Sequence, residues 1–359
     1  MNMKKLTAIL SLVLAVCLLS GCAGSTVVYY SDCTCPEGSH VQAPATEAPV
    51  VAEGALKTGL YITTNIRDSK SATAEENGEA KYDVTIVAVL VDDNGIIHDC
   101  IIDSVGTSVK FGADGIITTD LMATVLTKNE LGESYGMVAY GGAIAEWDAQ
   151  AAALAEYVIG KNALSLRSGA IDETGYAADA DLASSATIYL GGYVEAIEIA
   201  AGTAKHLGAQ TGDTLKLAVI NSVKSSTDAS AEKDGNAQLD VDVAAVTMNG
   251  ETITSCYIDA VQAKVAFDQN GTITSEIGGA VSTKNQLGDQ YGMKAWGGAK
   301  YEWWQQAESF CAYVTGKTLG EVQGIAIDET TKPTDADLSA SVTISIGGFL
   351  TLLSKAAAQ

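Results

Sequence analysis

Histidine is scarce in this chain of 359 residues, which has only three, His40, His98 and His206. They lie far apart and share no spacing with one another, so neither a zinc site nor a haem site is indicated. Basic side chains are also few, with 21 lysines and arginines against 44 aspartates and glutamates. The formal charge of −23 opposes binding to nucleic acid or to an anionic membrane surface.

Long apolar runs are missing from all of the sequence except its N-terminal end. There, Lys4 and Lys5 precede an apolar run over residues 6–19, which is shorter than the roughly 20 residues of a membrane-spanning helix. The run ends in Leu19-Ser-Gly-Cys22, which resembles the lipobox of bacterial lipoproteins, where the cysteine is acylated. We therefore expect residues 1–22 to be a lipoprotein signal peptide, Cys22 to carry the lipid, and the mature protein to be anchored at the extracytoplasmic face of the cell membrane.

Proline is rare as well, and three of the four prolines lie between residues 23 and 55. This stretch is rich in Ser, Thr, Ala and Glu and has little periodicity, which predicts a disordered stalk. It contains Cys33 and Cys35, which could bind a metal or meet oxidants, but no histidine or second cysteine pair completes a tetrahedral site.

The cysteines do not form a disulfide framework. Five remain once Cys17 and Cys22 are set aside, an odd number with irregular spacing. Cys100 and Cys256 lie at matching positions of two similar segments, within apolar runs, so we expect both to be buried as small hydrophobic residues.

Two segments of the sequence occur twice at the same offset. Asp181-Leu-Ala-Ser-Ser-Ala-Thr187 returns 156 positions later as Asp337-Leu-Ser-Ala-Ser-Val-Thr343, and a glycine pair and an apolar run follow each copy. Residues 127–137, Thr-Lys-Asn-Glu-Leu-Gly-Glu-Ser-Tyr-Gly-Met, match residues 283–293 at 8 of 11 positions. This similarity predicts two tandem repeats, 56–205 and 206–359, each with its own core and joined near Ala204 to Gly212.

Each predicted repeat changes from strand patterns to helix patterns along its length. In the first, β-branched and apolar residues 82–91 and 96–102 flank the turn Asp92-Asp-Asn-Gly95, and a second short hairpin is expected over 109–117. Apolar side chains then recur at helical spacing from Ile144 to Val158, before Gly160. The same order returns over 239–258, 265–273 and 303–316. We therefore expect an α+β fold in which each repeat is an antiparallel sheet with packed helices.

One catalytic pattern can be rejected. Gly132-Glu-Ser134-Tyr-Gly136 fits the Gly-x-Ser-x-Gly pattern of serine hydrolases, but the second copy has Gln290 in place of the serine. His206 is the only histidine that follows Ser134. No other set of residues indicates a turnover enzyme, so an electron carrier or a binding protein is expected.

The same loop holds a cation and an aromatic ring in each copy, Lys128 with Tyr135 and Lys284 with Tyr291. Two interpretations remain open. These side chains could form a pocket for a planar anionic ligand, with the lysine near a phosphate and the tyrosine stacked on a ring. Alternatively, they could fill space between helix and sheet, as is expected of Trp147 and Trp303.

The repeated motif Asp-x-x-Ser-Ser-Ala-Thr resembles the flavin-attachment motif of the FMN-binding domain family, whose usual form is Asp-x-x-Ser/Thr-Gly-Ala-Thr. In that family, a flavin transferase attaches FMN to the last threonine as a phosphoester. The surrounding repeat is similar to tandem-repeat lipoproteins of Gram-positive anaerobes that are grouped with this family. The resemblance implies FMN held covalently, with these residues at the motif positions: Thr187, Asp181, Ser184 and Ser185 in the first copy, Thr343 and Asp337 in the second.

The second copy departs further from the motif, with Ala340 in place of Ser184 and Val342 in place of Ala186. A β-branched valine beside the acceptor is expected to hinder a transferase that grips extended backbone, so one flavin per chain is expected rather than two. Gly191-Gly192, at the start of the following helix, could offer backbone donors to a phosphate.

These features together predict a membrane-anchored flavoprotein that carries FMN for electron transfer, with a flavin transferase and redox proteins as partners. The alternative is a non-redox surface lipoprotein, a binding or interaction module that keeps a degenerate FMN-binding fold without flavin.

Overall fold

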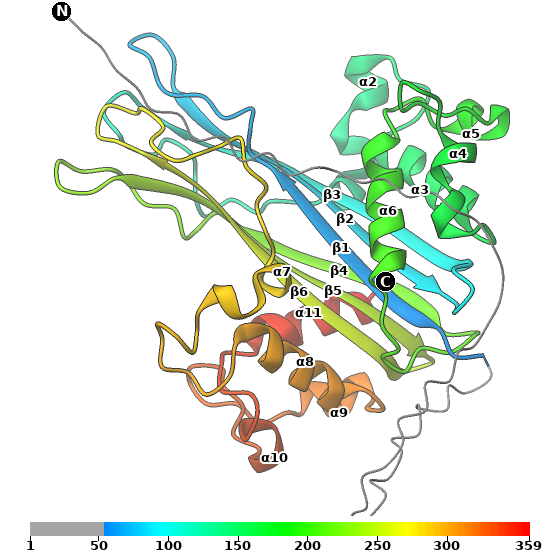
Figure 1. The fold of residues 1–359 in the computed structure, drawn as a ribbon. Helices are drawn as coiled ribbons and strands as arrows, with labels where there is room; N and C mark the ends of the chain where they lie inside the picture. The colour runs from blue at the N-terminus through cyan, green and yellow to red at the C-terminus, as the bar shows by residue number, and fades with distance from the viewer. Residues whose placement is uncertain (1–53) are drawn as a thin grey trace, which may run out of the picture. The chain divides into compact units, whose positions relative to one another are not determined.

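The computed structural model describes residues 54–359, so the expected signal peptide, Cys22 and nearly all of the expected stalk lie outside the described residues. Val51–Gln359 forms one compact unit. It is a mixed α+β structure with two three-stranded antiparallel sheets at its centre (Figure 1). The strands of the first sheet are β1 (Lys57–Asn65), β2 (Gly78–Val91) and β3 (Ile97–Phe111), and those of the second are β4 (Thr214–Ser222), β5 (Gly235–Asn249) and β6 (Thr252–Phe267).

The first predicted hairpin is confirmed, because β2 and β3 pair across the expected turn. Asp92 shapes this turn by accepting hydrogen bonds at 2.9 Å from the amides of Asn94 and Ile96. The second predicted hairpin is present in a short form: residues 109–111 continue β3, and the chain turns back so that Phe111 pairs with Ile117 in an antiparallel bridge. The Thr118 amide donates to the Lys110 carbonyl at 2.8 Å beside this bridge. Strands β1 and β4 were not predicted.

The two sheets share one apolar core, in addition to a cluster that each half forms with its own helices. Alternate residues of β2, among them Tyr82, Val84 and Ile86, pack in one cluster with Val241 and Val243 of β5. Because successive side chains of a strand point to opposite faces, this cluster is formed by the side chains on one face of each sheet. The halves therefore depend on each other for burial of their strands.

Helices cover the outer faces of the sheets (Figure 1). Val87, Val89 and Val91 of β2 point away from the shared core into a second cluster with α3 (Trp147–Val158) and α6 (Gly191–Gly202). A third cluster joins the outer face of the second sheet to α8 (Trp303–Val314) and α11 (Gly347–Ala357). Residues 86–91 of β2 and 243–248 of β5 are thus buried on both faces, which is why these parts of the strands are almost entirely apolar.

Both predicted long helices are present, and each ends before a glycine with positive φ, Gly160 or Gly316. Ile144 lies outside the first of them and is exposed, so the predicted start was too early. The remaining helices are short: α1 (Lys128–Leu131), η1 (Gly132–Tyr135), α2 (Met137–Gly141), η2 (Ala163–Ser165), α4 (Arg167–Ala170), α5 (Ala180–Ser185), α7 (Lys284–Leu287), η3 (Gly288–Tyr291), α9 (Leu319–Gln323) and α10 (Ala336–Ser339).

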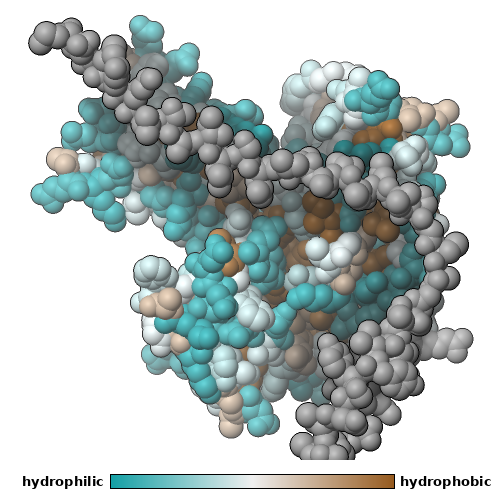
Figure 2. All heavy atoms as spheres, viewed as in Figure 1, coloured by the Kyte–Doolittle hydropathy of each residue, from teal (hydrophilic) through white to brown (hydrophobic). Residues whose placement is uncertain are grey.

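Hydrophilic residues predominate at the periphery of the view in Figure 2, while hydrophobic residues show toward its middle. Within residues 54–359, no helix has both the length and the apolarity that crossing a membrane requires.

Candidate functional site

The candidate acceptor Thr187 lies two residues after the end of α5 and is exposed to solvent. One side-chain oxygen, Oε1 of Gln150 in α3, accepts hydrogen bonds from the Thr187 amide at 2.8 Å, from its hydroxyl at 3.2 Å and from the Ile188 amide at 3.2 Å. These bonds fix the backbone and the side chain of the threonine together. The hydroxyl is therefore held at the surface in one orientation.

The amide group of Gln150 also joins the threonine to a second loop. Its Nε2 donates to the carbonyl oxygen of Ala145 at 2.8 Å, while the side chain as a whole is fully buried. A buried amide with its polar atoms paired is stable, whereas loss of either partner would leave an unpaired group. Gln150 thus joins the loop before α3 to the segment after α5.

The second half repeats this arrangement at residues 156 positions later. Oε1 of the buried Gln306 accepts from the Thr343 amide at 2.8 Å, from the Thr343 hydroxyl at 3.1 Å and from the Ile344 amide at 3.2 Å. Nε2 of Gln306 donates to the carbonyl of Tyr301 at 3.0 Å. Thr343 is exposed, as Thr187 is.

The other residues of the motif have mainly structural contacts. Asp181 is exposed, and the residue that caps α5 is Asp179, which accepts from the amides of Asp181 and Leu182. The hydroxyl of Ser184 donates to the Asp181 carbonyl at 2.7 Å, and Ser185 is exposed beside it. In the second half, Asp337 is likewise exposed, and Asp335 caps α10.

The structure corrects two expectations about the surroundings of the acceptors. The side chain of Val342 is fully buried in the core beneath α8 and α11, as that of Ala186 is beneath α3 and α6, so it does not stand beside the Thr343 hydroxyl at the surface. The Gly191 amide donates to the Gly175 carbonyl at 3.0 Å, so this amide is not free for a phosphate.

The lysines and tyrosines of the predicted loop come together with the tryptophans. Nζ of Lys128 lies 5.1 Å from the ring centroid of Tyr135 and 5.0 Å from that of Trp147. In the second half, Lys284 lies 5.3 Å from the ring of Tyr291 and 4.9 Å from that of Trp303. Both tryptophans are buried, as expected, so the lysines rest on aromatic rings at the amino ends of α3 and α8.

Two exposed aromatic rings occur at matching positions that the sequence reasoning missed. Tyr140 is 93% exposed and Trp296 is 86% exposed, although both are large and apolar. Four residues before each ring lies a glycine with a φ of +82°, Gly136 or Gly292. A side chain at this glycine would collide with the ring. Tyr140 lies in α2 and Trp296 in a turn, in the segments that lead to Ala145 and Tyr301, the carbonyl partners of the two glutamines.

Lys300 brings a cation to the second motif. Nζ of Lys300 is 3.5 Å from the carbonyl oxygen of Ala340, three residues before Thr343. The corresponding residue of the first half is Ile144. The second motif is therefore the more favourable of the two for a phosphate.

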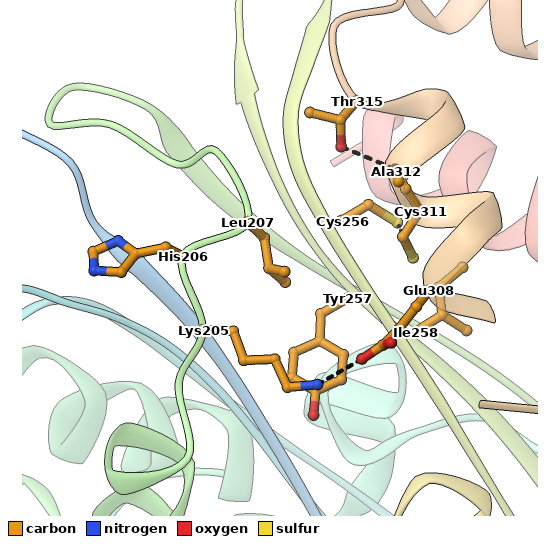
Figure 3. A pocket seen from close by; sticks show the side chains of 10 residues that line it. All are labelled: Lys205, His206, Leu207, Cys256, Tyr257, Ile258, Glu308, Cys311, Ala312 and Thr315. Carbon is orange, nitrogen blue, oxygen red and sulfur yellow. Dashed lines mark hydrogen bonds and ion pairs between the residues drawn. The ribbon is translucent and has the colours of Figure 1, made fainter. Parts of the chain in front are cut away.

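A separate cavity of about 500 Å³ lies at the edge of the second sheet (Figure 3). The loop after α6, strand β6 and helix α8 form its walls, which are lined by Lys205, His206, Leu207, Cys256, Tyr257, Ile258, Glu308, Cys311, Ala312 and Thr315. Lys205 and Glu308 form an ion pair of 2.7 Å across it. Within residues 54–359, no group of three or more His, Cys, Asp or Glu side chains is placed to hold a metal ion.

Comparisons with family models, with curated proteins and with solved structures find no match to this chain.

Proposed function

We propose that the chain is a lipid-anchored, extracytoplasmic electron-transfer protein that carries FMN as a phosphoester on Thr187 and on Thr343. The observation that carries the proposal is the exposed threonine whose amide and hydroxyl are both held by a buried glutamine, in the same way in the two halves. The position of Thr187 in an Asp-x-x-Ser-x-x-Thr motif agrees with the resemblance to the FMN-binding domain family, and Thr343 follows Asp337 at the same spacing. Cys22 would carry the lipid.

We further propose that the two halves are tandem copies of one FMN-binding-like domain. The order of three strands, a capped short helix, a Trp-x-x-Gln helix and a last glycine-initiated helix occurs in each. Thr127 and Thr283 cap α1 and α7 in the same way, each accepting a hydrogen bond from the amide three residues later. The shared core means that the copies act as one folded body rather than as two separate domains.

The residues present suit a flavin mononucleotide in two respects. An accessible hydroxyl is the group that a phosphoester requires, and Gln150 and Gln306 keep it at the surface. Exposed aromatic rings, Tyr140 and Trp296, lie in the segments before α3 and α8, and an aromatic face is the natural neighbour of a planar ring. Bound FMN would supply the one- and two-electron redox chemistry.

Attachment requires a nucleophilic oxygen and an activated flavin nucleotide. The threonine Oγ1 would form the new bond to phosphorus while the bond from phosphorus to the leaving group breaks, and a base of the transferase would take the hydroxyl proton. The part played by this chain is to present the hydroxyl. The hydroxyl donates to a glutamine oxygen and belongs to an exposed residue in both halves.

We favour two flavins per chain over one. The objection to Thr343 was the bulk of Val342, which is buried away from the surface, while Lys300 adds a positive charge near the second motif. A phosphate beside Thr343 would gain from this charge at low ionic strength.

The proposal can be tested by flavin fluorescence in denaturing gels of protein produced beside an active flavin transferase. We expect a fluorescent band from the wild type, a weaker one from Thr187→Ala or Thr343→Ala, and none from the double variant. Thr334→Ala, which removes another exposed hydroxyl near the second motif, is the control and should leave the fluorescence unchanged. A dark wild-type band, or fluorescence that persists in the double variant, would overturn the proposal.

A non-redox binding module is the second candidate, and the cavity beside Tyr257 favours it. Its mostly apolar lining and single ion pair suit a small apolar ligand. A thermal shift with a cell-envelope compound, without any shift or attachment with FMN or riboflavin, would select this function.

A further inference from the structure

Two cysteine side chains meet in the wall of the cavity beside β6. The Sγ atoms of Cys256 and Cys311 are 2.9 Å apart, and both residues are buried and free. Cys256 belongs to β6 and Cys311 to α8, so the pair connects the second sheet to the helix that covers it (Figure 3). The sequence predicted that Cys256 is buried as a small hydrophobic residue, and it is buried. The proximity of Cys311 was not predicted.

The first half has no such pair, although its backbone follows the same course. Cys100 of β3 matches Cys256, but the residue of α3 that matches Cys311 is Ala155. Cys100 and Ala155 are both buried in the core beneath α3. The fold therefore does not need a second sulfur at this place, and the pair is a property of the second half alone.

The environment of the sulfurs restrains their reactivity. Burial, and then the neighbouring Cys311, raises the pKa of Cys256 well above its usual value, so the thiol form prevails at neutral pH. The cavity offers a route to the sulfurs, which lie in its wall (Figure 3). The His206 side chain, at another part of the lining, is bonded to Asp93. A reagent that enters the cavity meets Cys311 and Cys256 together.

We propose that Cys256 and Cys311 are a dithiol that an external disulfide oxidises to an intramolecular disulfide. The sulfur of one cysteine, after losing its proton, bonds to a sulfur of the external disulfide and releases the first thiolate. The second cysteine, also deprotonated, then attacks the mixed disulfide and releases the second thiolate. The protein loses two electrons and two protons, and the external disulfide becomes two thiols.

This bond would tie β6 to α8 across 55 positions of the chain. Cross-linking of this kind restricts the unfolded state, so the oxidised form should be the more stable one. Gln306, which bonds the second acceptor Thr343, lies near the start of α8. Oxidation therefore also ties down the helix that holds this threonine. The proposal does not depend on flavin, and its test has a readout of its own.

The test uses the full-length protein, incubated with oxidised glutathione in its folded state and also refolded in a glutathione redox buffer. Free thiols are then blocked, and the protein is digested for mass spectrometry without reduction. We expect the peptides of Cys256 and Cys311 to be linked, with a mass two hydrogens below their sum, and the link to be lost on reduction. Cys100 should carry the blocking group throughout.

Cys311→Ala copies the residue that the first half has at this place and is the matched variant, because alanine is accommodated there. This variant should lack the link and carry the blocking group on Cys256. On oxidation, the melting temperature of the wild type and of Cys100→Ala should rise by several degrees, whereas that of Cys311→Ala should not. Blocked Cys256 and Cys311 in the wild type after both treatments would overturn the proposal. Links from either residue to Cys33, Cys35 or Cys100 instead would also overturn it.

Discussion

The rings of Phe111 and Phe267 stack with their centroids 4.0 Å apart and their planes 2° from parallel. They occupy matching positions at the ends of β3 and β6, and both are fully buried. Reciprocal hydrogen bonds surround them, from the Ala72 amide to the Gly271 carbonyl and from the Ala229 amide to the Gly115 carbonyl. The two halves are therefore joined by this ring stack and by backbone hydrogen bonds that run in both directions between them.

Phe111→Ala is expected to destabilise the whole unit and not only the first half. Loss of a buried phenylalanine costs about 3–5 kcal/mol, and here it also removes the partner of Phe267. Urea unfolding followed by circular dichroism should show one transition shifted to lower urea. Leu164→Ala, at an 85% exposed position, should stay within about 0.5 kcal/mol of the wild type. Two transitions, of which only one moves, would contradict the shared core.

Tyr82→Phe is expected to stabilise the protein by about 1 kcal/mol. The Tyr82 side chain is fully buried, and its hydroxyl has no hydrogen-bond partner among residues 54–359. Tyr291→Phe is the matched comparison, because it removes a hydroxyl that donates to Gln262 at 3.1 Å and should be neutral or destabilising. Equal effects of the two substitutions on the unfolding free energy would show that the unpaired hydroxyl has no cost.

The buried carboxyl of Asp259 is expected to make stability fall as the pH rises from about 4 to about 6. Burial raises the pKa of Asp259 from 3.8 to about 6, although Thr283 and the Asn285 amide bond to it. Because the folded pKa exceeds the unfolded one, folding takes up a proton between these values. The free energy of unfolding is therefore lower above pH 6 than below pH 4 by on the order of 3 kcal/mol. Protonated Asp259 therefore favours the folded state, and ionised Asp259 opposes it.

This pH dependence can be isolated by comparison with Asp259→Asn, which cannot ionise. As the pH rises from 4.5 to 7.5, the unfolding free energy of the wild type should fall relative to that of the variant. Asp103→Asn, at the matching position, should act in the same direction, because burial also raises the pKa of Asp103. A difference that stays constant with pH would contradict the raised pKa.

Gln306→Leu is expected to release the second acceptor segment. The amides of Thr343 and Ile344 and the carbonyl of Tyr301 would lose their partner, at a cost of about 1–3 kcal/mol. Hydrogen exchange at the two amides should become faster, and attachment of flavin at Thr343 should fall while attachment at Thr187 stays. Gln323→Leu, on an exposed helix position, is the control. Unchanged exchange at Thr343 would show that Gln306 does not position it.

The sequence allowed the β2–β3 hairpin and the two long helices to be predicted, because turn residues and apolar spacing are local signals. The face-to-face packing of the sheets was not predictable in this way. Apolar residues on both faces of β2 indicate that both faces are covered, but they do not distinguish a helix from the other sheet as the cover. The core that the two sheets share was missed for this reason.

At the candidate site, the sequence pointed to the threonines but missed the glutamines that hold them. A usable signal was present, since Gln150 and Gln306 recur at the repeat offset on the otherwise apolar faces of α3 and α8. A polar residue repeated at a core position indicates a buried hydrogen-bonding role. The proximity of Cys311 to Cys256 carried no such signal, because nothing repeats it in the first half.

The most direct test of the central proposal is the intact mass of the protein isolated from its native host. We predict a chain that begins at a lipid-modified Cys22 and carries two additions, each the mass of FMN less one water, located by peptide mapping at Thr187 and Thr343. A lipid-modified chain without any flavin addition would contradict the account.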